Sequence, residues 1–323
     1  MKKISAAIIG LGRIASLLEE DSRREKPCTH AGAISANADC ELVAGSDLDE
    51  ERRSLFAQRW GVPVYTDASE MIKSHNPQIL VIATHPDSHY HYCRLAAEMN
   101  VPLIICEKPL ADTLREARKI AALGKKTIII TNHERRYSAD YIKAKEILES
   151  RKLGNILSVR AVLCMGEKKR LVDVFWHDGT HLADALMFLT GKALKHRKRI
   201  GAKLSASSGT AWLLGELGPN PVIFEIGAGR DHLIFEMEFS LEKGRLCIGN
   251  GIFEVWESSE SPYAEKFRSL GKTNTSFDGP TGYFANMIAD AVSCVREPGR
   301  RPVSSAEHGL KVIEYLHSVK AWY

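Results

Sequence analysis

The chain has 323 residues, of which 44% are hydrophobic and 26% are charged. This composition is typical of folded globular proteins and excludes disordered, collagen-like and coiled-coil classes. The length favours two domains. The formal net charge of +4 is far less basic than that of nucleic-acid-binding domains, so we expect small-molecule partners and neither nucleic acid nor membrane.

The seven cysteines contain no C-x-x-C pair, which is typical of a protein from a reducing compartment. The apolar run that follows Lys3 is short, and Arg13 interrupts it. This run predicts a buried first strand rather than a signal peptide, and no run reaches the roughly 18 apolar residues of a membrane span. We therefore expect a cytoplasmic location.

Apolar runs alternate with helical patterns from the N-terminus to residue 131. The expected strands are 5–9, 41–44, 79–83, 103–106 and 127–131, and the expected helices include 50–60, 89–99 and 114–123. Strands of this apolar density are buried on both faces, as in parallel sheets covered by helices. The pattern predicts a doubly wound α/β domain.

The pattern changes near residue 139. After a helix at 139–150, strand-like runs are separated by turns that contain glycine, asparagine and proline; they are 156–165, 211–216, 222–228, 232–241, 245–249 and 252–257. Such runs predict a mostly antiparallel sheet. A helix at 179–189 interrupts the sheet, and helices at 282–295 and 306–319 close the chain.

Residues 10–15, with the sequence GLGRIA, follow the first expected strand directly and open an expected helix. They match the G-x-G-x-x-G/A fingerprint of dinucleotide-binding domains, with a plain strand-to-helix turn as the alternative. The first glycine allows a tight turn, and the second lets the backbone approach a pyrophosphate at the helix N-terminus. We expect Gly10, Gly12, Arg13 and Ile14 to bind the cofactor.

Asp47 ends the second expected strand, where an acidic residue accepts hydrogen bonds from the adenosine ribose and favours NAD over NADP. It follows Ala15 by 32 residues, against about 20 in the fingerprint. Seven of the eight residues 19–26 are charged, which indicates a solvated loop insertion. Asp47 could instead cap the next helix, and Arg52 or Arg53 could admit a 2′-phosphate, so NADP stays possible.

Further motifs follow in order along the chain. They are ATHPDSH at 83–89, CEKPL at 106–110, RRY at 135–137 and HLAD at 181–184. Together they resemble the Gfo/Idh/MocA oxidoreductases, and the resemblance runs through the whole chain. It implies a Rossmann domain, an open C-terminal sheet that often forms the oligomer interface, and nicotinamide-dependent oxidation or reduction of a sugar or cyclitol. It also implies a cis peptide bond between Lys108 and Pro109.

The expected fold is therefore an α/β Rossmann domain at residues 1–132, followed by an α+β domain with an open, mostly antiparallel sheet at residues 133–323. The second domain would bind substrate and form a homodimer or homotetramer through its sheet. The closing helices 282–295 and 306–319 are expected to pack back towards the first domain.

Oxidation of an alcohol by hydride transfer requires a base near the hydroxyl, and histidine titrates in the useful range. The family pattern is Asp-x-x-x-His-x-x-Asp, and here His177 stands at the first Asp position while His181 and Asp184 match. The resemblance implies His181 as general base and Lys108 as the cation that lowers the hydroxyl pKa. We expect His177 to contact substrate or relay a proton, with Asp178 as an alternative source of the carboxylate. A capping or packing histidine is the structural alternative for His177.

Two histidines at i and i+4 could also bind a metal with Asp184. No cysteine or glutamate completes a zinc set nearby, so we expect no metal. The resemblance adds cofactor-lining positions Thr84, Pro86, His89 and Glu107, and substrate-pocket positions His133, Arg136, Asp178, Asp184 and Tyr283. The basic stretches at 168–170 and 192–203 could attract an anionic substrate or form a solvated face.

Two other functions compete with an NAD(P)-dependent sugar or cyclitol dehydrogenase. One is an enzyme that keeps NAD(P) tightly bound as a transient redox carrier, as an aldose oxidoreductase or an oxidation–elimination glycosidase does. The other is a non-catalytic nucleotide-sensing regulator, against which the presence of Lys108 and His181 argues.

Overall fold

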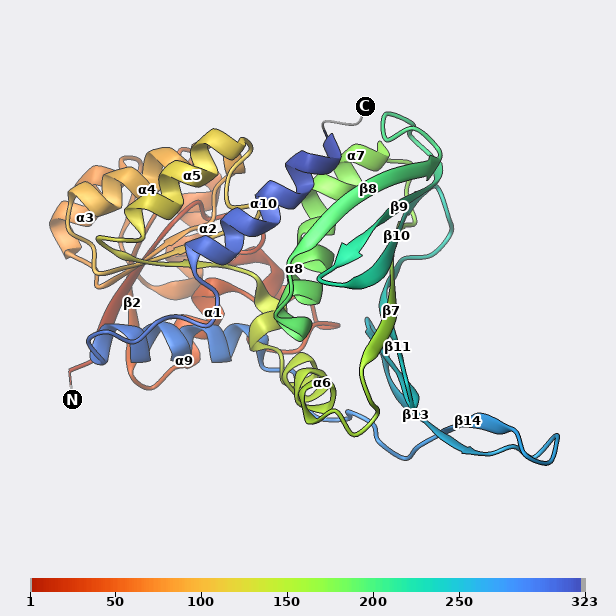
Figure 1. The fold of residues 1–323 in the computed structure, drawn as a ribbon. Coiled ribbons are helices and arrows are strands. Elements are labelled where there is room, and N and C mark those ends of the chain that lie inside the picture. Colours follow the sequence, from red (N-terminus) through yellow and green to blue (C-terminus); the bar gives the residue numbers. More distant parts are fainter. Residues whose placement is uncertain (1, 321–323) are drawn as a thin grey trace. The chain divides into compact units, whose positions relative to one another are not determined.

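The computed structural model describes residues 2–320, which divide into two compact units (Figure 1). The first unit comprises the residues up to Ser138 together with Pro280–Ile313, and the second comprises Ala139–Gly279 together with the residues from Glu314 onward. None of the described helices combines the length and the apolar character that crossing a bilayer requires.

The first unit contains a six-stranded parallel sheet in the order β3-β2-β1-β4-β5-β6. Its strands are β1 (Ile4–Ile9), β2 (Cys40–Ser46), β3 (Val64–Tyr65), β4 (Ile79–Ile82), β5 (Leu103–Cys106) and β6 (Ile128–Thr131). This is the doubly wound order of a Rossmann domain, in which ligands bind beyond the carboxyl ends of the strands near the point where the order reverses. The predicted fold of this unit is confirmed, and among its described strands only the two-residue β3 was not expected.

Helices cover both faces of this sheet. They are α1 (His30–Ala36), α2 (Glu50–Trp60), α3 (Ala68–His75), α4 (His89–Glu98), α5 (Leu114–Leu123) and α9 (Tyr283–Arg296), with 3₁₀ turns η1 (Leu17–Glu20), η2 (Pro86–Ser88) and η3 (Glu134–Tyr137). The side chains of Thr29, Asp49 and Thr113 accept backbone N–H groups at the starts of α1, α2 and α5, which satisfies donors that a helix leaves unpaired. In Figure 1, α1 and α9 lie on one face and α3, α4 and α5 on the other.

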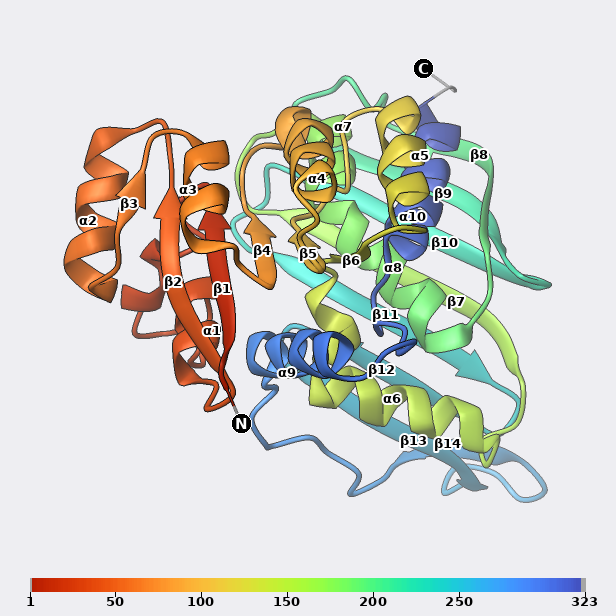
Figure 2. The same cartoon turned by 90° about the vertical axis from the view of Figure 1, so that its left-hand side faces the viewer.

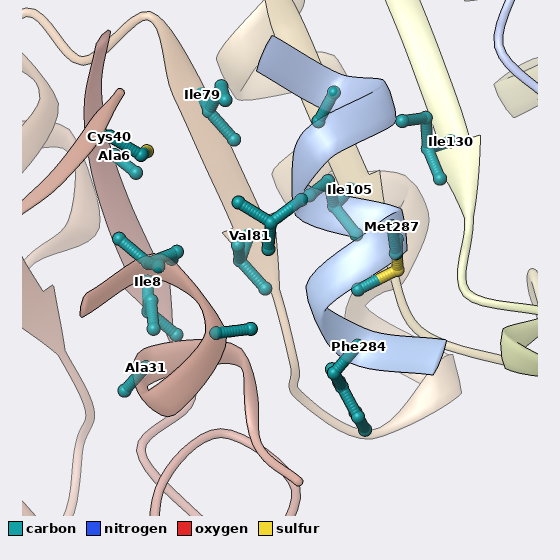
Figure 3. Packing of buried hydrophobic residues seen from close by; sticks show 14 of the residues in the cluster. Ala6, Ile8, Ala31, Cys40, Ile79, Val81, Ile105, Ile130, Phe284 and Met287 are labelled. Atoms are coloured by element: carbon teal, nitrogen blue, oxygen red, sulfur yellow. The ribbon is translucent and has the colours of Figure 1, made fainter. Parts of the chain in front are cut away.

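The core of the first unit joins segments that are far apart in sequence. Figure 3 shows Phe284 and Met287 of α9 beside Val81 and Ile105 of the sheet, and all four side chains are buried. Burying such a side chain contributes roughly 1.5–3 kcal/mol. α9 is therefore an integral part of the first unit.

The second unit contains an eight-stranded sheet in the order β14-β13-β12-β11-β7-β10-β9-β8. Its strands are β7 (Ile156–Met165), β8 (Leu194–Gly201), β9 (Gly209–Leu217), β10 (Asn220–Ala228), β11 (Ile234–Leu241), β12 (Gly244–Gly249), β13 (Ile252–Glu260) and β14 (Arg268–Lys272). Among these described strands, only β7 and β10 pair in parallel. The sheet is mixed and mostly antiparallel, as expected.

Two strands of this sheet were not expected, and both lie at its edges. β8 falls inside the basic stretch 192–203, and β14 carries a charge at each end. Charged edge strands discourage pairing with other chains, and their polar side chains hide the apolar alternation that marks inner strands.

Helices cover one face of the second sheet. α6 (Ala139–Ser150) and α8 (Gly179–Thr190) lie across it, as Figure 2 shows. The short α7 (Leu171–Asp173) and a π-helical turn, η4 (Val174–Asp178), lead into α8, and α10 (Ala306–Lys320) closes the chain. Tyr315 of α10 contacts Phe175 and Phe224 with ring centroids 6.0 and 5.4 Å apart.

Candidate functional site

The glycine turn after β1 is built for close backbone approach. Gly10 has a φ of +86°, and a Cβ on it would lie 2.8 Å from the carbonyl carbon and oxygen of Ala83. Among the residues that the structure describes, no protein acceptor takes the N–H of Gly12, Arg13 or Ile14. These donors fit the phosphates of a dinucleotide, as the sequence predicts.

Asp47 lies directly against this turn. Its Oδ2 accepts the N–H of Leu11 at 2.7 Å, and its Oδ1 accepts the N–H of Asp49 at 2.9 Å. Asp49, and not Asp47, caps α2 through the N–H of Arg52. The capping alternative for Asp47 is therefore wrong, and its carboxylate lies beside the glycine turn.

The two arginines that follow Asp47 differ in their contacts. Arg53 donates to the carbonyl oxygens of Asp47 and Leu48 at 2.8 and 2.9 Å, so its guanidinium stabilises the start of α2. Arg52 Nη1 lies 3.8 Å from Asp47 Oδ2, and it is the nearest group to a Cβ built on Gly12, also at 3.8 Å. The guanidinium of Arg52 therefore lies near both the glycine turn and the carboxylate of Asp47.

The helix expected directly after the glycine turn is interrupted by an excursion, residues 16–27. The carbonyl oxygens of Ile14 and Ala15 accept the N–H groups of His30 and Ala31 at 3.2 and 2.9 Å. In an α-helix the carbonyl of Ile14 would accept from residue 18, so α1 resumes the turn with the excursion spliced in. When the excursion is left out of the count, the spacing from Ala15 to Asp47 shortens to about 20, which is the spacing of the fingerprint.

Most of residues 19–26 in the excursion are exposed, as expected, but hydrogen bonds hold the excursion at two places. Glu19 accepts hydrogen bonds from the Thr29 hydroxyl at 2.6 Å and the Cys28 N–H at 3.2 Å. Glu25 accepts three hydrogen bonds of 2.8 Å from the N–H and hydroxyl of Thr281 and the N–H of Gly282. Glu19 ties the base of the excursion to the start of α1, and the exposed Glu25 binds the residues before α9.

Lys108 follows β5 and is half-buried, and its peptide bond to Pro109 is cis, as the resemblance implies. The adjacent Glu107 is buried, and its Oε1 lies 2.7 Å from Nε2 of His30 and 2.5 Å from Nδ2 of Asn132. Its Oε2 accepts the N–H of Lys108 at 3.2 Å. Burial raises the pKa of Glu107, but the His30 and Asn132 hydrogen bonds and the Lys108 charge outweigh it and lower that pKa below the usual value.

The loops after β4 and β5 are joined by His89. Its ring is fully buried, with Nδ1 3.1 Å from the carbonyl oxygen of Pro109 and Nε2 3.1 Å from that of Thr84. Burial lowers the pKa of His89 despite these contacts. The structure places Thr84 beside Gly10 and Pro86 at the start of η2, with His89 beneath the two loops.

Three expected substrate residues belong to the first unit. His133 directly precedes η3 and Arg136 lies within it, and both are buried. Arg136 Nη1 donates to the carbonyl oxygen of Val303 at 3.4 Å. Tyr283 begins α9 and is partly buried, which raises the pKa of its hydroxyl to about 12. The structure brings Tyr283 near Glu25 and Glu134, whose charges act on it.

The remaining expected residues lie in the second unit, at the junction of η4 and α8. His177 is exposed on the π turn, His181 is half-buried in the first turn of α8, and Asp184 is buried one turn later. Asp178 accepts a hydrogen bond from Lys169 Nζ at 3.2 Å. π turns are rare and occur often at functional sites, but the sequence carries no periodic signal for one. No group of three or more histidine, cysteine or acidic side chains among residues 2–320 is arranged to hold a metal ion.

Residues 4–131 match the family model GFO_IDH_MocA, described as "Oxidoreductase family, NAD-binding Rossmann fold". Inositol 2-dehydrogenase of Rubrobacter xylanophilus is 31% identical over 157 residues, which cover 47% of this chain and 42% of that protein. The match therefore spans less than half of that relative. D-glucoside 3-dehydrogenase of Escherichia coli is 24% identical over 295 residues, which cover 85% of this chain and 75% of that protein.

A solved structure shows the same fold over the full chain. It is an oxidoreductase from Agrobacterium radiobacter in complex with NAD+, L-tartaric acid and magnesium; the TM-score is 0.73 at 16% identity, covering 100% of this chain and 98% of that one. Both sheets described above belong to this shared fold. Residues 4–131 therefore belong to the Gfo/Idh/MocA family of oxidoreductases and form its NAD-binding Rossmann domain.

Proposed function

We propose that this protein transfers a hydride between a nicotinamide cofactor and a hydroxyl-bearing carbon of a sugar, sugar derivative or cyclitol. The observation that carries the proposal is Lys108 at the carboxyl end of β5, anchored to a buried, ionised Glu107 in a sheet whose β1 turn fits a dinucleotide. Open α/β sheets bind their ligands at this end. The names of the inositol and D-glucoside dehydrogenases support the substrate class.

The free N–H groups of the glycine turn and the carboxylate of Asp47 would hold the dinucleotide. When bound, the oxidised nicotinamide supplies the acceptor for the hydride. Lys108 would place its ammonium beside the substrate oxygen and stabilise the charge that develops there. His181 would accept the hydroxyl proton on its imidazole and return it in the reverse reaction.

His177 is the proposed second contact to substrate or the proton relay. Asp178 is the alternative carboxylate, but Lys169 already binds it, whereas His177 presents an exposed ring at the same turn. Asp184 and, in the first unit, His133, Arg136 and Tyr283 remain proposed substrate-pocket residues.

NAD is the proposed preferred cofactor, because a carboxylate at Asp47 repels a 2′-phosphate. Arg52 supports some tolerance of NADP, since its guanidinium lies near both Gly12 and Asp47.

The open face of the second sheet is the proposed interface of a homo-oligomer. Trp212 and Ile223 point to the same face, since Trp212 pairs with Glu225 and Ile223 with Leu214, and both are 39% exposed. Light scattering should give a dimer or tetramer for the wild type and a smaller species for Trp212→Glu. A monomeric wild type would contradict this proposal.

A screen of polyols and sugars with NAD and NADP, followed by NADH absorbance, tests the function directly. We expect turnover with at least one cyclitol or sugar and faster turnover with NAD. NADH fluorescence from the freshly purified protein would instead indicate a tightly bound redox carrier. Nucleotide binding without turnover of any compound in the screen would contradict the dehydrogenase and favour a regulator.

A further inference from the structure

Glu107 is a buried charged group whose partners the proposed reaction does not use. A buried carboxylate is costly unless donors surround it. The donors come from two other elements: His30 from the first residue of α1, and Asn132 from the residue after β6. Their contacts with Glu107 span 77 and 25 residues of sequence, so the tertiary fold assembles this cluster.

The donors divide the two oxygens of the carboxylate between them. Both His30 and Asn132 contact Oε1, which leaves Oε2 for the N–H of Lys108. A carboxylate held this way has a fixed plane, because rotation would break both contacts at Oε1. The backbone of Lys108 is thereby anchored where its side chain leaves the strand.

The ring of His30 is itself held in place. It is fully buried and meets the ring of Phe284 edge-on, with centroids 5.0 Å apart. The backbone N–H of His30 donates to Ile14 of the glycine turn. One residue therefore connects the turn expected to bind phosphate, through its backbone, with the carboxylate that anchors Lys108, through its side chain.

We propose that His30 and Asn132 are positioning residues, which fix Glu107 so that it holds Lys108 in place and couples Lys108 to the glycine turn. The catalytic importance of this coupling rests on the proposed function of Lys108. The anchoring itself does not, because it concerns only the folded first unit.

Hydrogen exchange of the Lys108 amide, measured by NMR on the full chain, tests the anchoring without any substrate. His30→Leu removes the ring donor, and His30→Gln keeps an N–H donor at the end of a side chain. Ile34→Ala in the same helix is the control, since it removes buried apolar packing and takes no hydrogen bond from Glu107. We expect about tenfold or faster exchange at Lys108 in His30→Leu, partial recovery in His30→Gln, and the wild-type rate in Ile34→Ala.

The same variants separate positioning from simple destabilisation once a substrate is known. In His30→Leu we expect kcat to fall about tenfold or more, with a small change in KM. The acidic limb of its kcat profile should move to higher pH. Without the imidazole, burial dominates the pKa of Glu107; Lys108, His89 and Cys106 are the other titratable groups that act on this carboxyl or feel its charge.

An unchanged exchange rate at Lys108 in His30→Leu would overturn the proposal, whatever the enzyme does. Equal acceleration in Ile34→Ala would also overturn it, because the effect would then be general loosening of α1. If His30→Leu does not fold, Asn132→Leu and His30→Gln carry the same test. A wild type with no turnover would contradict only the proposed function and leave the exchange result standing.

Discussion

The two groups of expected catalytic residues are held by different physics. In the first unit, the carboxylate beside Lys108 is buried and bound by donors from two other elements. In the second unit, His177 is exposed on a π turn, and the neighbouring ion pair of Lys169 with Asp178 is partly solvated. Removing one partner of a buried charge typically costs several kcal/mol, whereas a surface pair contributes about 0–1 kcal/mol. In the first unit a buried carboxylate therefore anchors the backbone of Lys108, whereas in the second unit the exposed His177 can change at little cost to stability.

The largest expected effect follows from removing the charge of Lys108. Lys108→Ala should lower kcat by about 100-fold or more, because it removes the charge that stabilises the developing alkoxide. Affinity for NADH, measured by fluorescence titration, should stay close to that of the wild type. Lys125→Ala, at an exposed lysine of the same unit, is the control and should turn over normally. Unchanged turnover in Lys108→Ala would remove this residue from the mechanism.

Stability should separate the buried network from the surface pair. Asn132→Leu removes a donor to a charged carboxylate and should lower the free energy of unfolding by about 1–3 kcal/mol at neutral pH. Lys169→Ala should change it by less than about 1 kcal/mol. Urea denaturation of both variants measures this contrast, and equal losses would contradict it.

The pH dependence of the stability lost in Asn132→Leu tests whether the charge of Glu107 causes that loss. The pKa of Glu107 is lowered in the folded chain from its ordinary value of 4.5, so its contribution to stability is present above that value and is lost as the pH falls through the folded pKa. The stability gap between wild type and Asn132→Leu should therefore be full at neutral pH and close in acid. A gap that is independent of pH would mean that packing, and not charge, is the cause.

Cofactor preference should change by an intermediate amount. Asp47→Ala should weaken NAD binding about tenfold, since it removes hydrogen bonds to the ribose. The difference between the affinities for NAD and NADP should therefore become smaller. Arg52→Ala is the matched variant and should enlarge this difference in affinity, because it removes the guanidinium that supports NADP. A wild type that binds NADP more tightly than NAD would contradict the role of Asp47.

The smallest loss is expected where the second unit departs from the family pattern. His177→Asp restores the usual carboxylate and should keep substantial activity. In the wild type, protonation of either His177 or His181 should hinder oxidation, so the acidic limb of kcat/KM should be steeper than one proton. The variant should show a one-proton limb. A dead variant with intact fold and NADH binding would show that His177 does not stand in for the carboxylate, and stoichiometric metal in the wild type would point to a metal site.

Local sequence patterns predicted the bounds of elements whose signal lies within a few neighbouring residues. The bounds of β5 and α2 agree with expectation, because a continuous apolar run and a capped charged helix are visible in a few residues. His30 and Asn132 were missed because their contacts with Glu107 need the assembled sheet. A polar residue at each of two element ends, near the carboxyl edge of a parallel sheet, was the available signal.

In the second unit, a polar edge strand and an irregular helical turn could not be predicted from the sequence. The basic stretch that contains β8 carries no apolar alternation, so its pairing depends on the neighbouring β9. The π turn at His177 differs from an α turn only in backbone winding. The relation of His177 to His181 therefore could not be read from their spacing alone.

At the start of α1, distance along the sequence differs from distance along the hydrogen-bonded helix. Along the chain, the whole excursion lies between Ala15 and α1, yet through the hydrogen bonds of His30 and Ala31 the helix advances as if it were absent. The closure cost of such a loop grows only slowly with its length. Ala15 and Asp47 are 32 residues apart along the chain, but leaving out the excursion restores the fingerprint spacing of about 20. Loops of other lengths could then occupy the same position without moving the dinucleotide site.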